Sequence, residues 1–253
     1  IRIDSDIEIF CEAATAPIIG VTGSNGKTTV ITLLKEMLGN SDLKVATGGN
    51  IGAPALDLLD GKIPDYYLLE LSSFQLEATQ NLKTKVSSIL NITPDHIDRH
   101  TDFDSYAKAK QRIYKDTDIL VFNRHDQNTY SNSAANKLSF GLDTPNDESQ
   151  YGIRDDRGVT WLCRGEERLV VAGDLHLYGK HNLLNVLAVL AIIGCLDIPL
   201  HNLLPALKNF KGLPHRINLI FSKDDINWYD DSKATNVGAT LAALQSFSRK
   251  NIM

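Results

Sequence analysis

A glycine-rich stretch near the start of the chain, GVTGSNGKTT, carries residue types that bind phosphate. The common phosphate loop has a glycine, four further residues, a second glycine, a lysine, and then a serine or threonine. Gly26, Lys27 and Thr28 fit the end of that pattern. Val21 stands where the first glycine is expected, because Gly20 lies one residue too early. The spacing therefore misses the common pattern by one residue, although the chemistry of the side chains is retained.

The physical arrangement that binds phosphate survives this variant spacing. An apolar run leads into the loop and a helical pattern opens at Lys27, so backbone N–H groups and a helix N-terminus converge on an anion. Lys27 would reach the terminal phosphates of a nucleotide, and the Thr28 hydroxyl would ligate Mg²⁺. The alternative is a plain strand-to-helix turn with a surface lysine. The residues expected to hold the nucleotide here are Gly23, Ser24, Asn25, Gly26, Lys27, Thr28 and Thr29.

Two further polar side chains follow predicted strands, at the edge where open α/β sheets place their ligands. Glu70 ends the run YYLLE, and His96 comes shortly after VSSILNI. A carboxylate suits Mg²⁺, which prefers oxygen ligands, although Glu70 could instead be a solvated residue at a strand end. A lone histidine is more often structural than a metal ligand, so the spacing alone leaves His96 open. The neighbouring polar residues Asp95, Asp98, Arg99 and His100 are expected to be structural.

The elements that must position these residues follow a rhythm of short apolar run, loop and helical segment from Pro17 onward. This rhythm predicts a mostly parallel sheet with helices on its faces. The runs PIIGV, KVAT, YYLLEL, VSSILNI and DILVFN are the strand candidates, and helical periodicity covers 28–38 and 103–114. Between 137 and 177, turn signals at DDRG and RGEE split short alternating runs, which predicts a small antiparallel side sheet.

The last part of the chain has a different organisation. Helical patterns over 182–194 and 201–209 end at KGLP, a boundary because glycine and proline stop regular structure. Two strands, INLIFS and INWYDD, and one helix, VGATLAALQSF, follow. So small a unit cannot bury its own faces, and we expect the chain to be a fragment of something longer. The predicted domains are 1–212 and 213–253.

Composition limits the function classes. With 43% hydrophobic and 23% charged residues in 253, the chain is typical of a globular protein of one or two domains. The net charge of -5 argues against a general nucleic-acid partner. The longest apolar run, LLNVLAVLAIIGCL, is shorter than the roughly 20 residues of a bilayer span, so it predicts a buried helix and no membrane partner. Cys11, Cys163 and Cys195 are expected to be unpaired thiols in a reducing cytoplasm.

The variant loop resembles the signature of the Mur ligase superfamily, the ATP-dependent amide-forming enzymes of peptidoglycan synthesis and their folylpolyglutamate synthetase relatives. Seven more segments resemble family blocks, in the family's order, and together they cover nearly the whole chain. The resemblance implies the central ATP-binding domain and the start of a Rossmann-like C-terminal domain, without the family's N-terminal domain. The segments are GGNIG, LELSSFQLE, NITPDHIDRH, YAKAKQRIY, GKHNLLN, GLPHR and DDSKATN.

Within the superfamily, SSFQLE and DSKATN are most similar to the members that add D-glutamate to UDP-N-acetylmuramoyl-L-alanine. The resemblance implies that the γ-phosphoryl group of ATP is transferred to a carboxylate, and that the amine of D-glutamate attacks the acyl phosphate. Such chemistry depends mainly on positioning and charge neutralisation. The implied cofactors are ATP and two Mg²⁺ ions, and we expect a monomer in the cytoplasm.

The resemblance also implies a role for single residues. Thr28 and Glu70 would bind one Mg²⁺ ion and His96 the second, an unusual ligand for a metal that prefers oxygen. Asn182 and Asn185, three apart and so on one helix face, would contact the adenine region, Arg216 the γ-phosphate and Asp231 the ribose. The implied catalytic residues are Lys27, His96, Lys110 and Arg216. The implied substrate contacts are Asn50, Ser72, His96, Lys233 and Thr235.

One of two lysines in YAKAKQRIY is expected to be functional. Lys108 and Lys110 cannot share a helix face, so one of them should be a solvated surface residue. Counted from Tyr106, the family pattern selects Lys110, whose counterpart is carbamylated by CO₂. A carbamate would supply hard oxygen to Mg²⁺, and its formation needs a neutral amine, hence a lowered pKa. The alternative is a lysine that pairs with phosphate or with Glu70.

Other functions remain open from the sequence. A phosphate-loop kinase for a small metabolite would share the loop and metal, but it would need neither DSKATN nor the Lys110 segment. A non-catalytic nucleotide-binding module and a related ligase for another amino acid are further alternatives. Release of inorganic phosphate that depends on an amine would separate a ligase from a kinase.

Overall fold

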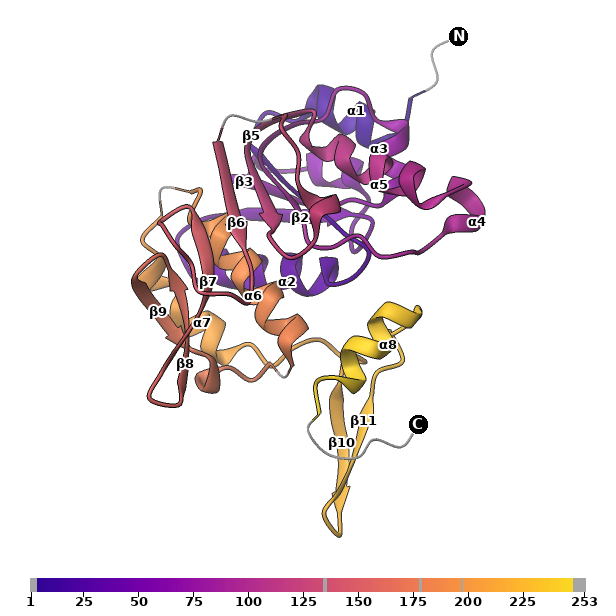
Figure 1. Ribbon diagram of the computed structural model, residues 1–253. Coiled ribbons are helices and arrows are strands. Elements are labelled where there is room, and N and C mark those ends of the chain that lie inside the picture. Colours follow the sequence, from indigo (N-terminus) through magenta and orange to yellow (C-terminus); the bar gives the residue numbers. More distant parts are fainter. Residues whose placement is uncertain (1–3, 134–135, 178, 197, 248–253) are drawn as a thin grey trace.

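The computed structural model describes residues 4–133, 136–177, 179–196 and 198–247. A nine-stranded sheet in the order β2-β3-β1-β4-β5-β6-β7-β8-β9 runs through the main body (Figure 1). Its strands are β1 (Ile18–Thr22), β2 (Val45–Gly49), β3 (Tyr66–Glu70), β4 (Lys83–Ile89), β5 (Asp116–Asn123), β6 (Asn136–Phe140), β7 (Gln150–Asp156), β8 (Val159–Arg164) and β9 (Glu167–Val171).

Every neighbouring pair from β2 across to β7 is parallel, so the expected mostly parallel sheet is confirmed. The expected antiparallel strands are present as well, because β8 pairs antiparallel with both β7 and β9. The turn signal DDRG joins β7 to β8, with positive φ at Arg157 and Gly158 as in a tight hairpin turn. The antiparallel strands are joined to the main sheet, since β7 pairs with two residues of β6.

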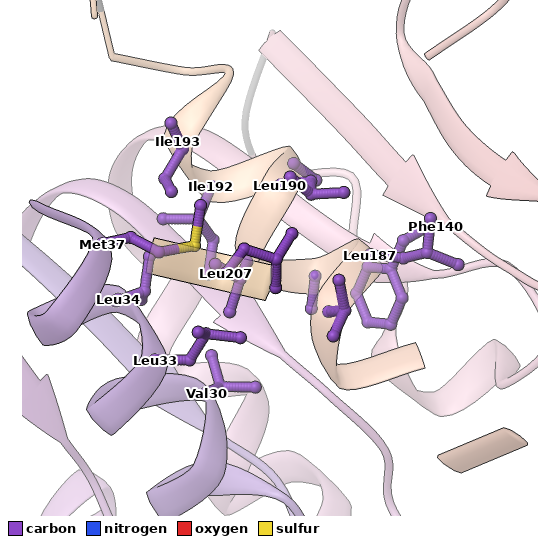
Figure 2. Close-up of a cluster of buried hydrophobic side chains, with 14 of the residues drawn as sticks. Val30, Leu33, Leu34, Met37, Phe140, Leu187, Leu190, Ile192, Ile193 and Leu207 are labelled. Atoms are coloured by element: carbon purple, nitrogen blue, oxygen red, sulfur yellow. The ribbon is translucent and has the colours of Figure 1, made fainter. Parts of the chain in front are cut away.

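Helices cover both faces of this sheet (Figure 1). The face with α2 (Lys27–Gly39), α6 (Lys180–Ile193) and α7 (Leu204–Asn209) forms one hydrophobic core, shown in Figure 2. The face with α1 (Asp6–Ala13), α3 (Ser73–Ala78) and α5 (Phe103–Gln111) forms the other core. Side chains alternate between the two, as the period of a strand requires: Ile19 and Val21 belong to the first core, and Ile18 to the second.

Several short helices were not predicted from the sequence. Both α1 and α3 begin with a serine cap: the Ser5 side chain accepts from the Glu8 backbone N–H, and Ser72 with Gln75 forms a capping box. His96, the N-cap of helix α4 (Ile97–His100), has a positive φ of 52°. Further short 3-10 helices that were not predicted lie at Ala55–Leu59, Gln127–Thr129 and Ala172–Asp174. Two others, Arg112–Tyr114 and Leu200–Asn202, fall in or overlap the stretches predicted as helical, 103–114 and 201–209.

The long apolar run is a buried helix, as predicted, because α6 packs on the first core with every residue from Asn185 to Ile193 buried. Among the residues that the structure describes, no helix has both the length and the apolar character needed to cross a membrane. All three cysteines are free thiols, as expected.

The C-terminal segment, which we define as residues 213–247, contains the two expected strands and the expected helix. Strands β10 (Asn218–Lys223) and β11 (Ile226–Asp230) pair antiparallel and project away from the main sheet, and α8 (Val237–Leu244) follows them (Figure 1). Both strands expose large apolar side chains, among them Leu219, Ile220, Phe221, Ile226 and Trp228. The domain division at residue 212 stays a prediction.

The first core predicts a clear stability difference between two aliphatic truncations. Leu34 on α2 is fully buried, so Leu34→Ala should lower the free energy of unfolding by about 2–5 kcal/mol through lost contacts and a residual cavity. Ile63 is 67% exposed, and Ile63→Ala should change it by less than about 0.5 kcal/mol. Urea unfolding followed by circular dichroism measures both. Equal effects would contradict the packing described here.

Candidate functional site

The glycine-rich loop joins β1 to α2 in the way that anion binding requires. Gly26 adopts the left-handed conformation, with φ of 87°, immediately before the helix. The backbone hydrogen bonds of the helix start at Val30, whose N–H donates to Gly26 O at 3.0 Å. The N–H groups of Lys27, Thr28 and Thr29 lie in the first turn, where a helix lacks internal acceptors, and they are placed to meet phosphate oxygens.

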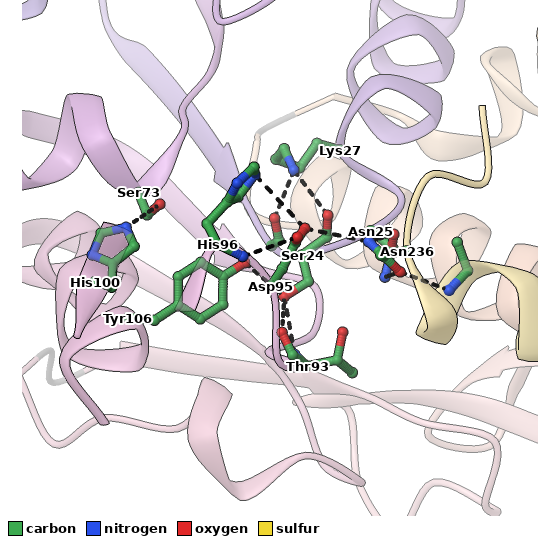
Figure 3. Close-up of polar contacts among 12 residues, drawn as sticks. Ser24, Asn25, Lys27, Ser73, Thr93, Asp95, His96, His100, Tyr106 and Asn236 are labelled. Carbon is green, nitrogen blue, oxygen red and sulfur yellow. Dashed lines mark hydrogen bonds and ion pairs between the residues drawn. The ribbon is translucent and has the colours of Figure 1, made fainter. Parts of the chain in front are cut away.

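The segment after β4 fixes the shape of this loop (Figure 3). Ser24 N donates to Asn91 O, and Asn25 N donates to Asn91 Oδ1, each at 2.9 Å. The Ser24 hydroxyl lies 2.9 Å from Thr93 O and 2.9 Å from the Tyr106 hydroxyl, while Thr93 N donates back to it. The hydroxyl of Ser24 therefore shapes the loop.

Two lysines converge on a single loop carbonyl. Lys27 Nζ donates to Gly23 O at 2.7 Å and to Ser24 O at 3.1 Å, and Lys110 Nζ donates to Gly23 O at 3.0 Å. Lys110 is 2% exposed, while Lys108 on the same helix is exposed, so the expectation that one of them is a surface lysine is confirmed. Lys110, a predicted site residue that is distant from the loop in the sequence, thus contacts the phosphate loop in the structure.

Burial lowers the pKa of both amines. It lowers the pKa of Lys110 to about 7, with the Lys27 ammonium as the second cause and the carboxylates of Asp95 and Glu70 opposing. Burial also lowers the pKa of Lys27, against the effect of the same two carboxylates. Lys110 therefore has a large neutral fraction near neutral pH, which is the state in which an amine is nucleophilic.

The buried carboxylate of Glu70 has the properties of a Mg²⁺ ligand. It is 2% exposed and accepts from the Thr28 hydroxyl at 3.0 Å and from Asn50 Nδ2 at 2.8 Å. Both donors are neutral, and Glu70 forms no ion pair within 4 Å in the part of the chain that the structure describes. A buried carboxylate without a paired cation, beside a hydroxyl and a phosphate loop, is an oxygen donor set that Mg²⁺ accepts together with phosphate oxygens.

The described residues hold no cluster of three or more His, Cys, Asp or Glu side chains that could bind a metal alone. His96 has a side chain that is 54% exposed, with Nε2 3.8 Å from Asp95 Oδ2 and its ring 5.3 Å from that of Phe74. In the part of the chain that the structure describes, His96 makes no hydrogen bond or ion pair with Lys110. The second set of metal ligands stays a prediction.

A cavity of about 220 Å³ lies beside the loop, between the N-termini of α2 and α6 and the C-terminal segment. Asn185 is buried against the loop, where a Cβ at Gly26 would overlap its Oδ1, so glycine is required there. Asn185 Nδ2 lies 3.3 Å from Asn182 Oδ1, which bears out their predicted common face. The predicted nucleotide contacts that line this cavity are Asn25, Gly26, Thr29, Asn182, Asn185, Arg216 and Asp231.

A second cavity, of about 550 Å³, opens beside Thr28 and Thr32 of α2. Thr28, Asn50 and Glu70 line it, and Arg216 and Lys233 line both cavities. The other three predicted substrate contacts, Ser72, His96 and Thr235, line neither of these cavities. The Ser72 hydroxyl accepts from Gln75 N in the cap of α3, and Thr235 is exposed.

Sequence reasoning did not assign Asn236, whose side chain contacts Asn25 and Asp95 (Figure 3). Nor did it give Asp95 more than a structural role, although this carboxylate acts on both site lysines. The available signals were their positions in DSKATN and TPDH, beside residues that had been assigned.

The fold and this site define a nucleotide-binding α/β domain organised around a phosphate loop and a buried acidic residue. The family model for the Mur ligase middle domain matches residues 21–193, and the chain belongs to the Mur ligase family.

Curated relatives extend this result. A UDP-N-acetylmuramoylalanine–D-glutamate ligase of Nitrosococcus oceani is 47% identical over 247 residues, which are 97% of this chain and 54% of the relative. One of Methylobacillus flagellatus is 44% identical over 98% of this chain and 55% of the relative. The chain therefore spans about half the length of the curated relatives it matches.

Solved structures show the same fold. A pseudomurein peptide ligase type C from Methanothermus fervidus matches 96% of this chain and 59% of its own, with a TM-score of 0.78 and 23% identity. The MurF ligase from Thermotoga maritima in complex with ADP matches 99% of this chain and 63% of its own, with a TM-score of 0.75 and 21% identity.

The lowered pKa of Lys110 predicts a pH dependence of stability. From about pH 7 to the ordinary value of 10.5, the unfolded chain binds a proton that folded Lys110 does not. This residue's contribution to the free energy of unfolding therefore rises with pH across that window and is least favourable below it. Lys110→Met removes that contribution, so the difference between wild type and variant should shift in favour of wild type as pH rises.

Urea unfolding in buffer free of CO₂ and metal, at several pH values, measures this difference. Lys108→Met is the matched control, because Lys108 is exposed on the same helix. A flat difference for Lys110→Met would contradict the lowered pKa.

Proposed function

We propose that the chain is the ATP-binding part of a ligase that joins D-glutamate to UDP-N-acetylmuramoyl-L-alanine in peptidoglycan synthesis. The observation that carries the proposal is the pair of cavities beside the N-terminal end of α2, with Arg216 and Lys233 lining both. A ligase of this kind must bring a nucleotide phosphate and an acceptor carboxylate together at one point. The names of the curated relatives support the choice of substrates. We also propose that the protein acts in the cytoplasm as a monomer.

In this mechanism, a carboxylate oxygen of the acceptor forms a bond to the γ-phosphorus of ATP, and the bond to the bridging oxygen breaks as ADP leaves. The D-glutamate nitrogen then bonds to the acyl carbon, inorganic phosphate leaves with the electron pair, and the nitrogen loses its proton. Mg²⁺, when bound, neutralises phosphate charge and orients the oxygens. Thr28 and Glu70 would hold it.

The residues of the chain would position the substrates and neutralise the charge of the phosphate groups. Lys27 and the N–H groups of the first turn of α2 would hold the β- and γ-phosphates. Arg216, at the border of the cavities, would stabilise the negative charge on the phosphoryl group in transfer. Asn50 would orient the acceptor in the second cavity, and Lys233 would meet its carboxylate. We keep Ser72 and Thr235 as proposed substrate contacts and Asp231 as a proposed ribose contact.

The reaction itself gives the test of this function. The full-length gene product should release inorganic phosphate from ATP only when both UDP-N-acetylmuramoyl-L-alanine and D-glutamate are present, in a one-to-one ratio with the amide product. Lys27→Ala should reduce turnover by about 100-fold or more, because one charged contact to phosphate in a buried site is lost. A coupled phosphate assay and mass spectrometry measure both products. Formation of a stable phosphorylated acceptor without amine would support a kinase instead.

We further propose that Lys110 is carbamylated and serves as a Mg²⁺ ligand together with His96. The neutral Lys110 amine would attack CO₂, form an N–C bond and lose a proton, which turns a cation beside Lys27 into an anion. The support is its burial, its contact with Gly23 O and its lowered pKa, which favours the neutral amine. The proposed ligand set would then consist of oxygens and one imidazole nitrogen.

Lys110→Ala in the full-length gene product should lose nearly all activity, and acetate should restore part of it by occupying the vacated position. With ¹³C-labelled CO₂, nuclear magnetic resonance should detect a protein carbamate in wild type and in Lys108→Ala, but not in Lys110→Ala. Lys108→Ala should keep wild-type turnover because its side chain is exposed. Full activity of Lys110→Ala, or a carbamate signal that survives it, would exclude this role.

A further inference from the structure

Helix α8 is attached to the central domain at both ends. At its start, Asn236 Nδ2 donates to Asn25 Oδ1 at 3.1 Å, and Asn25 Nδ2 lies 3.4 Å from Asn236 Oδ1, so the two amides form a reciprocal pair (Figure 3). Beyond its last turn, the Ser246 hydroxyl lies 3.2 Å from Nδ1 of His181 on α6. The helix between these contacts lies along the cavity of about 220 Å³ beside the loop and contributes Gly238, Ala239 and Ala242 to its lining.

The backbones approach closely at both contacts. A Cβ at Gly238 would lie 3.3 Å from Thr93 Oγ1, a distance that few real side chains tolerate. A Cβ at Gly179 would overlap the side chain of Ser246. The contact at Gly238, in the first turn of α8, therefore leaves little room for a side chain, and the contact at Gly179 leaves none, which indicates a specific docked position.

Asn236 links the loop to an acidic residue as well as to the helix. Its Nδ2 lies 3.3 Å from Asp95 Oδ2, and its Oδ1 accepts from Ala239 N at 2.8 Å as the cap of α8. Asp95 acts electrostatically on Lys27 and Lys110. One amide thus contacts the loop, the carboxylate that faces both site lysines, and the first turn of the C-terminal helix.

We propose that Asn236 is a positioning residue of the ligase reaction, which docks the C-terminal segment on the phosphate loop through Asn25 and Asp95. Docking would hold Arg216 and Lys233, which come from the same segment, at the border of the two cavities. The kinetic part of this inference rests on the proposed function, while the docking itself does not.

Asn236→Asp tests the role without removing the helix cap. A carboxylate still accepts from Ala239 N, but it donates no hydrogen bond and repels Asp95. We expect kcat to fall by roughly 10- to 100-fold, the effect of losing hydrogen bonds of this kind, with a smaller change in the KM for ATP. In Asn236→Ser, the serine can also cap the helix but is too short to reach Asn25. This variant should therefore lower kcat as well, without adding repulsion of Asp95. The midpoint of urea unfolding should stay close to wild type for both.

Hydrogen–deuterium exchange of the 253-residue chain gives a readout that does not depend on turnover. In wild type, ADP with Mg²⁺ should slow exchange over 237–247, because α8 lines the cavity that the nucleotide would enter. In Asn236→Asp, exchange there should be faster and insensitive to the nucleotide. Gln245→Glu is the matched control, since it makes an amide-to-acid change at the exposed C-cap of α8 and should behave as wild type.

Wild-type exchange and kcat in both Asn236 variants would overturn the proposal. Loss of kcat with wild-type exchange would overturn it too, because docking would then not be what Asn236 supplies. If the wild-type gene product makes no amide, the proposed function fails, and the exchange experiment still decides whether Asn236 docks α8.

Discussion

The convergence of Lys27 and Lys110 on the Gly23 carbonyl oxygen is the interaction around which the site is arranged. Two ammonium groups share one acceptor at 2.7 and 3.0 Å in a buried place, where like charges repel strongly. Glu70 and Asp95 oppose this repulsion, and Arg216 adds to it. Cations that outnumber their local partners favour binding of a polyanion. Burial, with the Lys27 ammonium as the second cause, favours the neutral form of Lys110. Phosphate affinity and a reactive amine therefore arise at the same buried, cation-rich place in the fold.

Strand order brings these groups together. Strands β3 and β4 lie on either side of β1 and run parallel to it, so the ends of all three strands meet at one edge of the sheet. The loop follows β1, Glu70 ends β3, and the segment that holds Ser24 and Asn25 follows β4. Helix α5 then returns along the sheet, and Tyr106 and Lys110, four residues apart on one face, both reach the loop.

The sequence predicted what depends on local periodicity and on short motifs. Every parallel strand from β1 to β5, the two long helices α2 and α6, and the loop beside Glu70 follow from apolar runs and glycine spacing. Contacts between distant side chains could not be predicted this way. The Asn25–Asn236 pair joins residues 211 positions apart, and neither asparagine differs locally from one that faces solvent. The cap of α3, in contrast, has a local signal that was not used, because a serine three residues before Gln75 is typical of a capping box.

Arg216 owes its position to a backbone that is strained and held at several points. His215 and Ile217, its two neighbours, both have positive φ, of 64° and 50°, and a β-branched residue there is a marked exception. Such conformations cost about 1–3 kcal/mol each and persist only where other contacts fix them. Asp231 accepts from Ile217 N, Asn218 from Arg216 N, and His215 O from Lys233 N. The same hydrogen bonds that hold the strained segment place Asp231 and Lys233 beside Arg216, so the position of the three polar groups at the cavities and the strain of the backbone have a single cause.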